Sequence, residues 1–428
     1  MFSYLPGLDL FCFPRLKIMC FQIRIRYNVR KTNKKGDNMS DVCICSCADY
    51  DPEHVRAALM QAVSDFLPQV RQGMTIAVKT NLVSAMPPEK AATTHPAILR
   101  ELCRLLTERG ASVVIGDSPG NLFVAPVLHH AYKVCGLEPL VREGVCLNED
   151  LGITEVEFPN AVSAKQFSVT SYLLKADMII NCCKFKTHGM MEITCAAKNM
   201  FGSIPGTMKP EYHFRFKDAD AFANMIVDVN EYLKPALCIC DAVTAMEGNG
   251  PTAGSPKEIG VILAAESPHK LDLAAAHLVG LDPQRVPTLR AAISRGLCPE
   301  HFSDLDVSGD GQDVLVADFL FSDGKRDIQF RNKGSDRQFV SSFLRFVLKS
   351  KPVLHKRHCV GCCKCANICP AKAITMKNGK PRIDRKKCIR CFCCQEFCPR
   401  GAMRVHRTWL ARLLTVFSKK TKAASSSR

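Results

Sequence analysis

The chain has 428 residues, of which 47% are apolar, so it is long enough for two to three domains with a buried core. Its 24 cysteines are the outlying number, yet many lie singly in apolar runs, unlike the short disulfide scaffolds of secreted proteins. We therefore expect free thiols in a reducing cytoplasm, and an anaerobic host would suit the protein. No run of eighteen apolar residues exists, and the sequence predicts no transmembrane segment.

The formal net charge of +17 is unevenly distributed along the chain. Residues 351–428 hold 20 Lys and Arg against two acidic residues, whereas residues 39–350 hold 30 basic and 37 acidic residues. A basic region on a mildly acidic body favours an acidic partner or surface for that region. The alternative is that thiolates bound to metal offset part of the charge and the rest keeps the protein in solution.

The N-terminal segment, residues 1–38, does not have the pattern of a signal peptide. It lacks a basic n-region, and Asp9, Pro14 and Arg15 interrupt its apolar stretch. Met39 then begins a stretch typical of a natural start. We interpret residues 1–38 as a wrongly assigned upstream start or a disordered extension rather than as a functional segment.

Residues 39–320 alternate apolar runs with amphipathic segments. Continuous apolar strands alternating with helices are typical of an α/β domain with a mostly parallel sheet and helices on both faces. The predicted strands are 42–48, 75–83, 111–120, 176–188, 236–243 and 259–267. The predicted helices are 52–66, 95–110, 219–233, 269–279 and 285–297.

The C-terminal quarter divides into three parts. Residues 321–351 read as a linker that contains an amphipathic helix. Residues 352–406 form a small α+β unit, in which Asn378-Gly379 predicts a hairpin turn. Residues 407–428 form a basic amphipathic tail, which we expect to fold back on the acidic body rather than lie on an anionic membrane.

Two cysteine runs within 352–406 match C-x2-C-x2-C-x3-C-P and are offset by 29 residues throughout. This repeat is the two-cluster bacterial ferredoxin signature, in which the fourth cysteine of each run ligates the other cluster. We therefore expect two [4Fe–4S] clusters. One is held by Cys359, Cys362, Cys365 and Cys398, and the other by Cys388, Cys391, Cys394 and Cys369.

Two further cysteines in this region do not fit the repeat. Cys363 follows a predicted ligand, whereas Cys393 precedes one, so neither is expected to bind a cluster. A pair of structural zinc sites is the alternative use of eight thiolates. The double triplet and the two trailing prolines favour iron–sulfur clusters.

Outside the cysteine runs, candidate functional side chains are most concentrated in the stretch KFKTHGMMEITCAAKNMFGSIPG, residues 184–206. Ammonium groups and glycine-rich backbone both favour anions, so we expect it to bind phosphate or carboxylate. Lys186 and Lys198 are the candidate charged groups, His188 the candidate proton donor and Asn199 a candidate ligand-binding residue. The alternative is a solvated loop in which His188 is a satisfied turn residue.

Other polar residues are expected at the carboxyl ends of strands, where ligands bind in open α/β sheets. Lys79 and Asn81 follow one strand, Asp117 another, and Asp241 and Glu247 border the glycine-rich segment 241–256. This segment matches no nucleotide-binding fingerprint. The remaining cysteines include Cys43, Cys45 and Cys47 on one strand and the pair at 238 and 240. They read as core thiols, with a third metal site as the weaker alternative.

Taken in order, TNLV, TTHP, GDSPG, KFKTH, AAKNMFGSIPG and DAVTAMEGNGPTAG resemble the family called domain of unknown function 362 over about residues 42–300. Members often occur in iron–sulfur proteins of bacteria and archaea. The resemblance implies an α/β fold and a role in oxidoreduction or electron transfer. The positions before KFKTH that are apolar or proline in the family are Cys182 and Cys183 here.

These patterns favour an iron–sulfur oxidoreductase that passes low-potential electrons to a small anionic substrate in the α/β domain. A redox partner, namely a ferredoxin, flavodoxin or reductase, would supply the electrons. The alternative is a non-catalytic electron carrier or adaptor whose α/β domain binds a partner or effector. Nucleic acid is not expected as a partner, because aromatic residues are sparse in the basic region and no nucleic-acid motif occurs.

Overall fold

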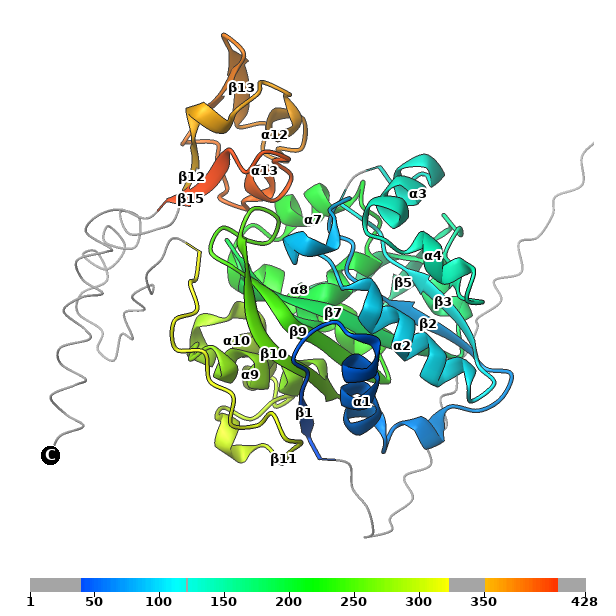
Figure 1. The fold of residues 1–428 in the computed structure, drawn as a ribbon. Coiled ribbons are helices and arrows are strands. Elements are labelled where there is room, and N and C mark those ends of the chain that lie inside the picture. The colour runs from blue at the N-terminus through cyan, green and yellow to red at the C-terminus, as the bar shows by residue number, and fades with distance from the viewer. Residues whose placement is uncertain (1–39, 121, 323–350, 407–428) are drawn as a thin grey trace, which may run out of the picture. The chain divides into compact units, whose positions relative to one another are not determined.

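The computed structural model describes residues 40–120, 122–322 and 351–406, and its largest element is a nine-stranded sheet (Figure 1). The strand order is β11-β1-β10-β9-β7-β2-β3-β4, with β8 paired to β7. The strands are β1 Val42–Ser46, β2 Thr75–Lys79, β3 Ser112–Gly116, β4 Cys146–Leu147, β7 Met178–His188, β8 Glu192–Thr194, β9 Leu237–Glu247, β10 Ser255–Ala265 and β11 Val307–Ser308. Residues 1–38, the helix expected before residue 351 and the tail 407–428 lie outside the described residues.

Most neighbouring strands of this sheet run parallel, as predicted, but β10 is antiparallel to both β1 and β9. The sequence interpretation ended the preceding strand at residue 243, whereas β9 continues to Glu247. Only residues 248–254 then separate β9 from β10, and so short a connection can join only antiparallel strands. The glycine-rich segment is therefore the tip of a long hairpin, and the sheet is mixed.

Helices cover both faces of the sheet. Ile76 and Val78 of β2 pack with α1 and α2, whereas Ala77 between them packs with α8 on the opposite face. The helices of this domain are α1 Pro52–Val63, α2 Pro96–Thr107, α3 Ala125–Val134, α4 Glu138–Val141, α5 Ser171–Lys175, α6 Ala196–Asn199, α7 Lys209–Arg215, α8 Ala219–Leu233, α9 Pro268–Leu278 and α10 Pro287–Ser294. A separate hairpin, β5 Ile153–Glu157 with β6 Gln166–Thr170, was not predicted.

Local signals explain where the long helices begin and end. Asp51 caps α1 by accepting a hydrogen bond from the N–H of Glu53, and Pro52 occupies the first turn, where no N–H is needed. Pro96 does the same for α2. Gly110, at a φ of +80°, follows the end of α2 and turns the chain into β3. The predicted positions of these helices are confirmed to within a few residues.

The cysteine-rich region, which we call the module (residues 351–406), is symmetric about its 29-residue repeat. Its strands and helices are β12 Lys351–Leu354, α12 Lys364–Asn367, β13 Ile374–Lys377, β14 Lys380–Ile383, α13 Cys393–Glu396 and β15 Met403–His406. Adding 29 to the bounds of β12, α12 and β13 gives β14, α13 and β15. The two antiparallel pairs, β12 with β15 and β13 with β14, are therefore equivalent.

The backbone of the module repeats the same symmetry in its unusual conformations. Cys363 and Phe392, 29 residues apart, have φ values of 61° and 60°, and each caps one of the two short helices. The predicted hairpin turn is also confirmed, because Asn378 and Gly379 both have positive φ and join β13 to β14. The repeat partner of Cys363 is thus a phenylalanine, consistent with a cysteine outside the ligand set.

Candidate functional site

The KFKTH segment forms the end of the central strand β7 rather than a loop, and each of its side chains is buried. The strand predicted over residues 176–188 ends at the same residue as β7, whereas the alternative of a solvated loop is wrong for this segment. Phe185 packs in the core on the side of α9, while Lys184 and Lys186 reach polar partners on the other side. Alternation along the strand thus presents Lys184, Lys186 and His188 together. The strand thus holds two lysines and a histidine in the buried interior.

Lys79 and Asp117, at the ends of the neighbouring strands β2 and β3, form a buried ion pair. Lys79 Nζ lies 2.7 Å from Asp117 Oδ1, and both side chains are less than 5% exposed. Gly202 lies against this pair, because a Cβ at that position would come within 2.4 Å of both charged atoms. Only glycine lets the backbone after α6 approach so closely.

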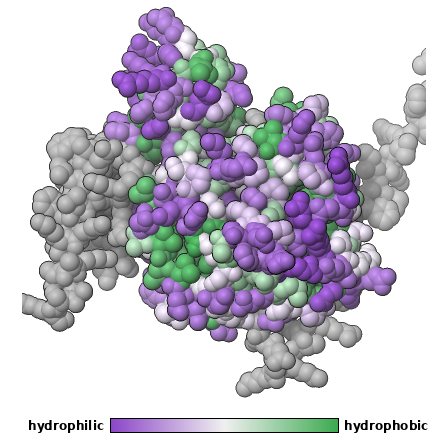
Figure 2. All heavy atoms as spheres, viewed as in Figure 1, coloured by the Kyte–Doolittle hydropathy of each residue, from purple (hydrophilic) through white to green (hydrophobic). Residues whose placement is uncertain are grey.

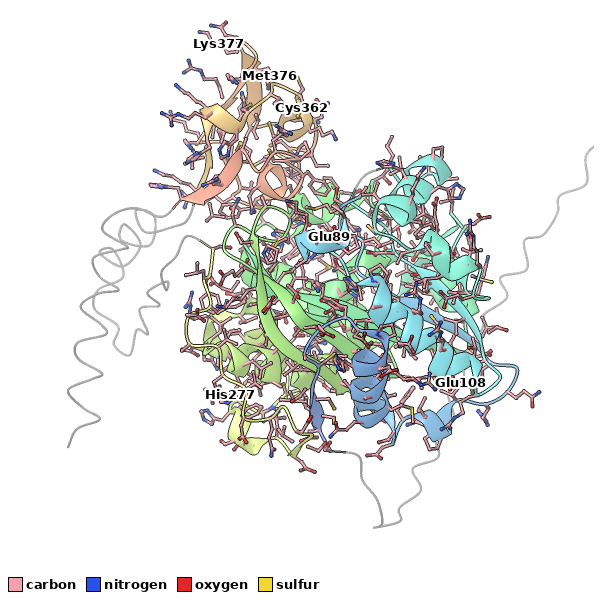
Figure 3. All side chains as sticks on the ribbon, viewed as in Figure 1. Glu89, Glu108, His277, Cys362, Met376 and Lys377 are labelled. Carbon is pink, nitrogen blue, oxygen red and sulfur yellow. The ribbon has the colours of Figure 1, made fainter. Side chains whose placement is uncertain are left out.

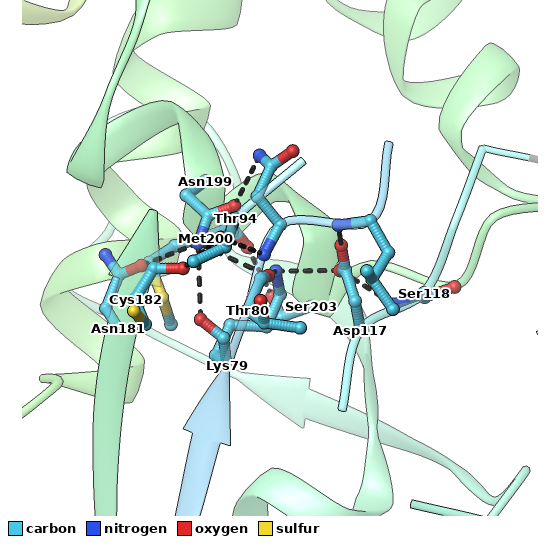
Figure 4. A network of polar contacts seen from close by, with 12 residues as sticks. Lys79, Thr80, Thr94, Asp117, Ser118, Asn181, Cys182, Asn199, Met200 and Ser203 are labelled. Carbon is cyan, nitrogen blue, oxygen red and sulfur yellow. Dashed lines mark hydrogen bonds and ion pairs between the residues drawn. The ribbon is translucent and has the colours of Figure 1, made fainter. Parts of the chain in front are cut away.

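A directed chain of side-chain amides connects Lys186 to the interior, and Figure 4 shows its inner end at Asn199 and Asn181. Lys186 Nζ donates to Asn81 Oδ1 at 2.8 Å, Asn81 Nδ2 donates to Asn199 Oδ1 at 2.8 Å, and Asn199 Nδ2 donates to Asn181 Oδ1 at 2.7 Å. Every amide in the chain both donates and accepts, so each orientation is fixed by its neighbours. The lysine is held in place by a rigid network of neutral groups.

Lys186, Lys198 and Lys209 line one small cavity of about 50 Å³, together with His188, Asp117 and Asn199. No carboxylate of the described residues lies within ion-pair distance of these three lysines. Burial lowers the pKa of Lys186 to about 7 and that of Lys209 to about 8, and it also lowers the pKa of Lys198. Three buried ammonium groups without anions of their own make this cavity suited to an anionic ligand.

His188 enters the cavity in a defined neutral form. Its Nδ1 accepts hydrogen bonds from the backbone N–H groups of Met190 at 3.0 Å and Met191 at 3.1 Å. The ring proton must therefore lie on Nε2, which has no hydrogen-bond partner in the described residues. Burial and the nearby lysines hold the pKa of His188 well below its usual value. The side chain can thus donate a hydrogen bond to a ligand.

The module contributes one wall of the same cavity. Glu396, at the end of α13, lines it, and Glu396 Oε2 lies 3.8 Å from His188 Nε2. A larger cleft of about 680 Å³ lies between the module and the α/β domain and shares Gly120 and Glu396 with the cavity. Cys398 also lines this cleft. The shared residues place this cleft next to the lysine-lined cavity.

The tip of the β9–β10 hairpin holds the module against the domain. Gln395 Nε2 donates to the carbonyl of Gly250 at 2.6 Å, and Thr252 Oγ1 donates to the carbonyl of Glu396 at 2.8 Å. The tip is in turn fixed to β7, because Thr187 Oγ1 donates to Gly248 O at 3.0 Å and accepts from Gly250 N at 3.1 Å. Thr187 lies between the two cavity residues of β7, so the docking contact and the cavity share one strand.

The predicted cluster ligands line two cavities of the module in the expected crossed sets. Cys359, Cys362, Cys365 and Cys398 line one, and Cys369, Cys388, Cys391 and Cys394 line the other. Cys362 lies on the exposed surface (Figure 3). The two crossing cysteines receive matching N–H···S hydrogen bonds of 3.2 Å, from Ala373 to Cys369 and from Ala402 to Cys398. Soft sulfur ligands with such N–H donors suit iron–sulfur clusters.

The structure brings together most, but not all, of the residues singled out from sequence. Lys79, Asn81, Asp117, Lys186, His188, Lys198 and Asn199 lie at the cavity or directly beside it. Asp241 instead pairs with Lys184 at 2.9 Å, and Glu247 accepts a hydrogen bond from Leu320 N at the start of the hairpin. Neither of these two carboxylates lines the cavity.

Sequence reasoning did not find Lys209 or Glu396 as cavity residues. Lys209 donates to the Ser118 carbonyl from α7, a helix whose position the sequence interpretation did not predict. Glu396 carried a signal, because it and Asp384 are the acidic residues among the 78 residues from 351 to 428. An acidic side chain that lies between two predicted cluster ligands in sequence is a candidate site residue.

Comparison with known proteins gives two family matches. The family described as domain of unknown function 362 matches residues 76–277, and a 4Fe-4S dicluster domain matches residues 351–399. A thylakoid-associated protein of Synechocystis sp. is 31% identical over 237 residues, which cover 54% of this chain and 70% of that protein. The chain belongs to the domain of unknown function 362 family. In this family member, the C-terminal module is a 4Fe–4S ferredoxin-type domain.

A solved structure, that of the lactate racemase apoprotein from Thermoanaerobacterium thermosaccharolyticum, is also similar. It is 12% identical, with a TM-score of 0.35, and the match spans about half of each chain, 53% of this one and 54% of that one. Among the described residues of the present protein, no helix combines the length and the apolar character needed to cross a membrane.

Proposed function

We propose that the protein is an iron–sulfur oxidoreductase that uses two [4Fe–4S] clusters to reduce a small anion in the lysine-lined cavity. The observation that carries this proposal is the position of Glu396. This residue lies two positions from both Cys394 and Cys398 and forms a wall of the cavity that holds Lys186, Lys198 and Lys209. The groups suited to electron transfer and those suited to anion binding therefore meet at one place.

The two ligand sets are part of this proposal. One set is Cys359, Cys362, Cys365 and Cys398, and the other is Cys369, Cys388, Cys391 and Cys394, each lining its own cavity. When bound, such clusters supply electrons one at a time, and a pair of them matches a two-electron reduction. The N–H groups of Ala373 and Ala402 would stabilise negative charge on the crossing sulfurs.

The residues of the cavity have separate tasks in this proposal. Lys186, Lys198 and Lys209 neutralise the anion, and their low dielectric surroundings strengthen that attraction. His188 orients the ligand by donating a hydrogen bond from its Nε2–H group. The amide chain from Asn81 to Asn181 keeps Lys186 fixed without neutralising it. The ion pair of Lys79 with Asp117 supports the floor of the site.

The module has the charge expected for docking an acidic electron carrier. Residues 351–406 contain 14 Lys and Arg but only Asp384 and Glu396 as acidic residues. Figure 2 shows that the visible face of the module is largely hydrophilic. Cys362 and Val360 are exposed on the module, so one predicted cluster approaches its surface. We propose that a ferredoxin, a flavodoxin or a reductase with an acidic surface docks there, in a reducing compartment.

The test is a reoxidation screen under anaerobic conditions. Protein reduced with dithionite and freed of excess reductant is mixed with single oxyanions and small carboxylates, and the cluster absorbance near 400 nm is followed. We expect one class of anion to reoxidise the protein at least tenfold faster than buffer, and the Lys198→Met variant to lose this acceleration. Lys257→Met is the control, because Lys257 pairs with Asp318 outside the cavity.

The same screen separates the two classes of function. An anion that binds to the lysines, shown by calorimetry, without any acceleration of reoxidation would assign the chain to the electron carriers or adaptors with an effector site. Equal reoxidation by Lys198→Met and by the unaltered protein would contradict the proposed site.

A further inference from the structure

Three fully buried cysteines outside the module meet at one point of the α/β core. Cys183 on β7 and Cys240 on β9 are direct partners in the parallel ladder. Cys195 follows β8 and is the residue before α6. Cys195 Sγ lies 3.8 Å from Cys183 Sγ and 3.5 Å from Cys240 Sγ, and all three sulfurs lie within 4.8 Å of one another. Segments distant in sequence thus bring three thiols together.

These separations match the dimensions of a metal–thiolate site. Zinc–sulfur bonds of about 2.3 Å in a tetrahedron separate neighbouring sulfurs by about 3.8 Å. A single ion therefore fits among the three sulfurs with little movement of the core. An iron–sulfur cubane does not fit, because its ligand sulfurs stand much further apart than these three, which are packed in direct contact.

A buried carboxylate next to the thiols supplies a second, independent observation. Asp272 of α9 is 1% exposed, and its oxygens accept the N–H of Ala197, each at 3.3 Å, while its carboxylate also contacts the Cys195 thiol. None of the ion pairs among the described residues includes Asp272. A buried carboxylate without a cation is costly, and a metal ion held by the adjacent sulfurs would provide the missing positive charge.

We propose that Cys183, Cys195 and Cys240 bind one thiophilic d¹⁰ ion, zinc(II) or copper(I). Three sulfurs suffice for copper(I), whereas zinc would take Asp272 as its fourth ligand. Binding releases the thiol protons to solvent and fixes β7, β9 and the start of α6 to one another. The ion is structural, because the site is closed to solvent and offers no open position for a substrate.

The location gives this ion a role in the shape of the cavity. Lys198 and Asn199 lie on α6, three and four residues after Cys195. Lys186 and His188 lie on β7, three and five residues after Cys183. One ion therefore ties the two segments that carry the cavity residues, from the opposite face of the sheet. The proposal does not depend on which anion the cavity binds or on whether that anion is reduced.

The test measures metal in the full-length protein, purified anaerobically and passed over a weak chelator. Mass spectrometry of the elements should find about one zinc or copper per chain in addition to iron and sulfide in equal amounts. The Cys195→Ser and Cys240→Ser variants should retain less than a tenth of that zinc or copper. Cys182→Ser and Cys238→Ser are the matched controls, because these thiols are equally buried on the same two strands, and they should retain it.

X-ray absorption at the zinc or copper edge, which the iron of the clusters does not obscure, identifies the ligands. Three sulfurs at about 2.3 Å with one oxygen would identify zinc, and three sulfurs alone would identify copper(I). If the serine variants fail to fold, this spectrum of the unaltered protein and its change in Asp272→Asn decide the question. Zinc and copper at background level in the unaltered protein, equal loss in the control variants, or a disulfide between any two of the three cysteines would overturn the proposal.

Discussion

The module and the lysine-lined cavity organise their chemistry in opposite ways. In the module, every proposed ligand lies within a run of eleven residues, and the run repeats after 29 residues with the same helices, strands and left-handed positions. In the α/β domain, the cavity gathers Asn81, Asp117, Lys186, Lys198 and Lys209 from one strand, two helices and two loops. The ligand set of a local motif can be transferred between proteins as one segment of sequence. The cavity residues, in contrast, are brought together only by the packing of the whole sheet.

The module departs from its own symmetry at its contact with the cavity. The repeat partners of Gln395 and Glu396 are Ala366 and Asn367, although the helices that carry them are equivalent. Gln395 binds the hairpin tip and Glu396 lines the cavity. At these two positions, departure from the internal repeat therefore coincides with contact to the α/β domain.

The largest expected effect tests the ligand assignment in the module, whose residues are close together in sequence. Cys362→Ser should lower iron from about eight to about four atoms per chain, because one cluster loses a ligand. Cys363→Ser, one residue away, should keep the full amount, because Cys363 donates to Gly361 O and is equivalent to Phe392. Iron and sulfide assays on anaerobically purified protein measure both. Loss of iron in Cys363→Ser instead would show that the ligand assignment is shifted.

The next largest effect tests the packing on which the cavity depends. Gly202→Ala places a methyl group against both Lys79 Nζ and Asp117 Oδ1, so the buried pair must separate. We expect the free energy of unfolding to fall by about 3 kcal/mol, the usual cost of disrupting such a pair. Gly144→Ala is the control, because its φ of +86° is strained but nothing lies nearby, and about 1 kcal/mol should be lost. Equal losses in urea denaturation would show that the close approach is unimportant.

A smaller effect concerns the charge of the cavity as the pH changes. Buried lysines with pKa values of about 7 and about 8, those of Lys186 and Lys209, are charged below these values and neutral above them. The affinity for sulfate, whose own charge is constant in this range, should therefore fall as the pH rises from 6 to 9. Lys186→Arg should flatten this dependence, since a guanidinium remains charged. Calorimetry at several pH values measures it, and a flat profile in the unaltered protein would contradict the assignment.

The smallest expected effect tests the role of Gln395, one of the two positions at which the repeat symmetry of the module is broken at the cavity. Gln395→Ala removes the hydrogen bonds to Gly250 and Asn249 but touches no cluster ligand. Iron content should be unchanged, while anion-dependent reoxidation should slow by about three- to tenfold, as expected for the loss of about 1 kcal/mol of docking energy. Ala366→Ser, at the equivalent position of the other half, should leave the rate unchanged. An effect of equal size in both variants would mean that the two halves serve the domain alike.

The same contrast explains what the sequence predicted. The hairpin at Asn378, the two short helices and the ligand spacing all depend on neighbours within a few residues, and the pattern shows them directly. The strands and main helices of the α/β domain also carried clear apolar periods. The antiparallel direction of β10 and the deep burial of the KFKTH segment were not predicted, because strand order and burial depend on pairing between distant segments. Lys209 could not be predicted for the same reason.

The hydrogen bonds of Thr187 to both sides of the hairpin tip determine how precisely the module is positioned against the α/β domain. The hairpin tip that contacts the module is bonded to β7, and β7 also carries cavity residues. A displacement of β7 therefore moves the contact surface and the cavity together. The position of the module relative to the cavity then depends on the Thr187 hydroxyl together with the hydrogen bonds of Gln395 and Thr252. The loss of the hydroxyl at position 187 should therefore shift the hairpin tip, and with it the module, relative to the cavity.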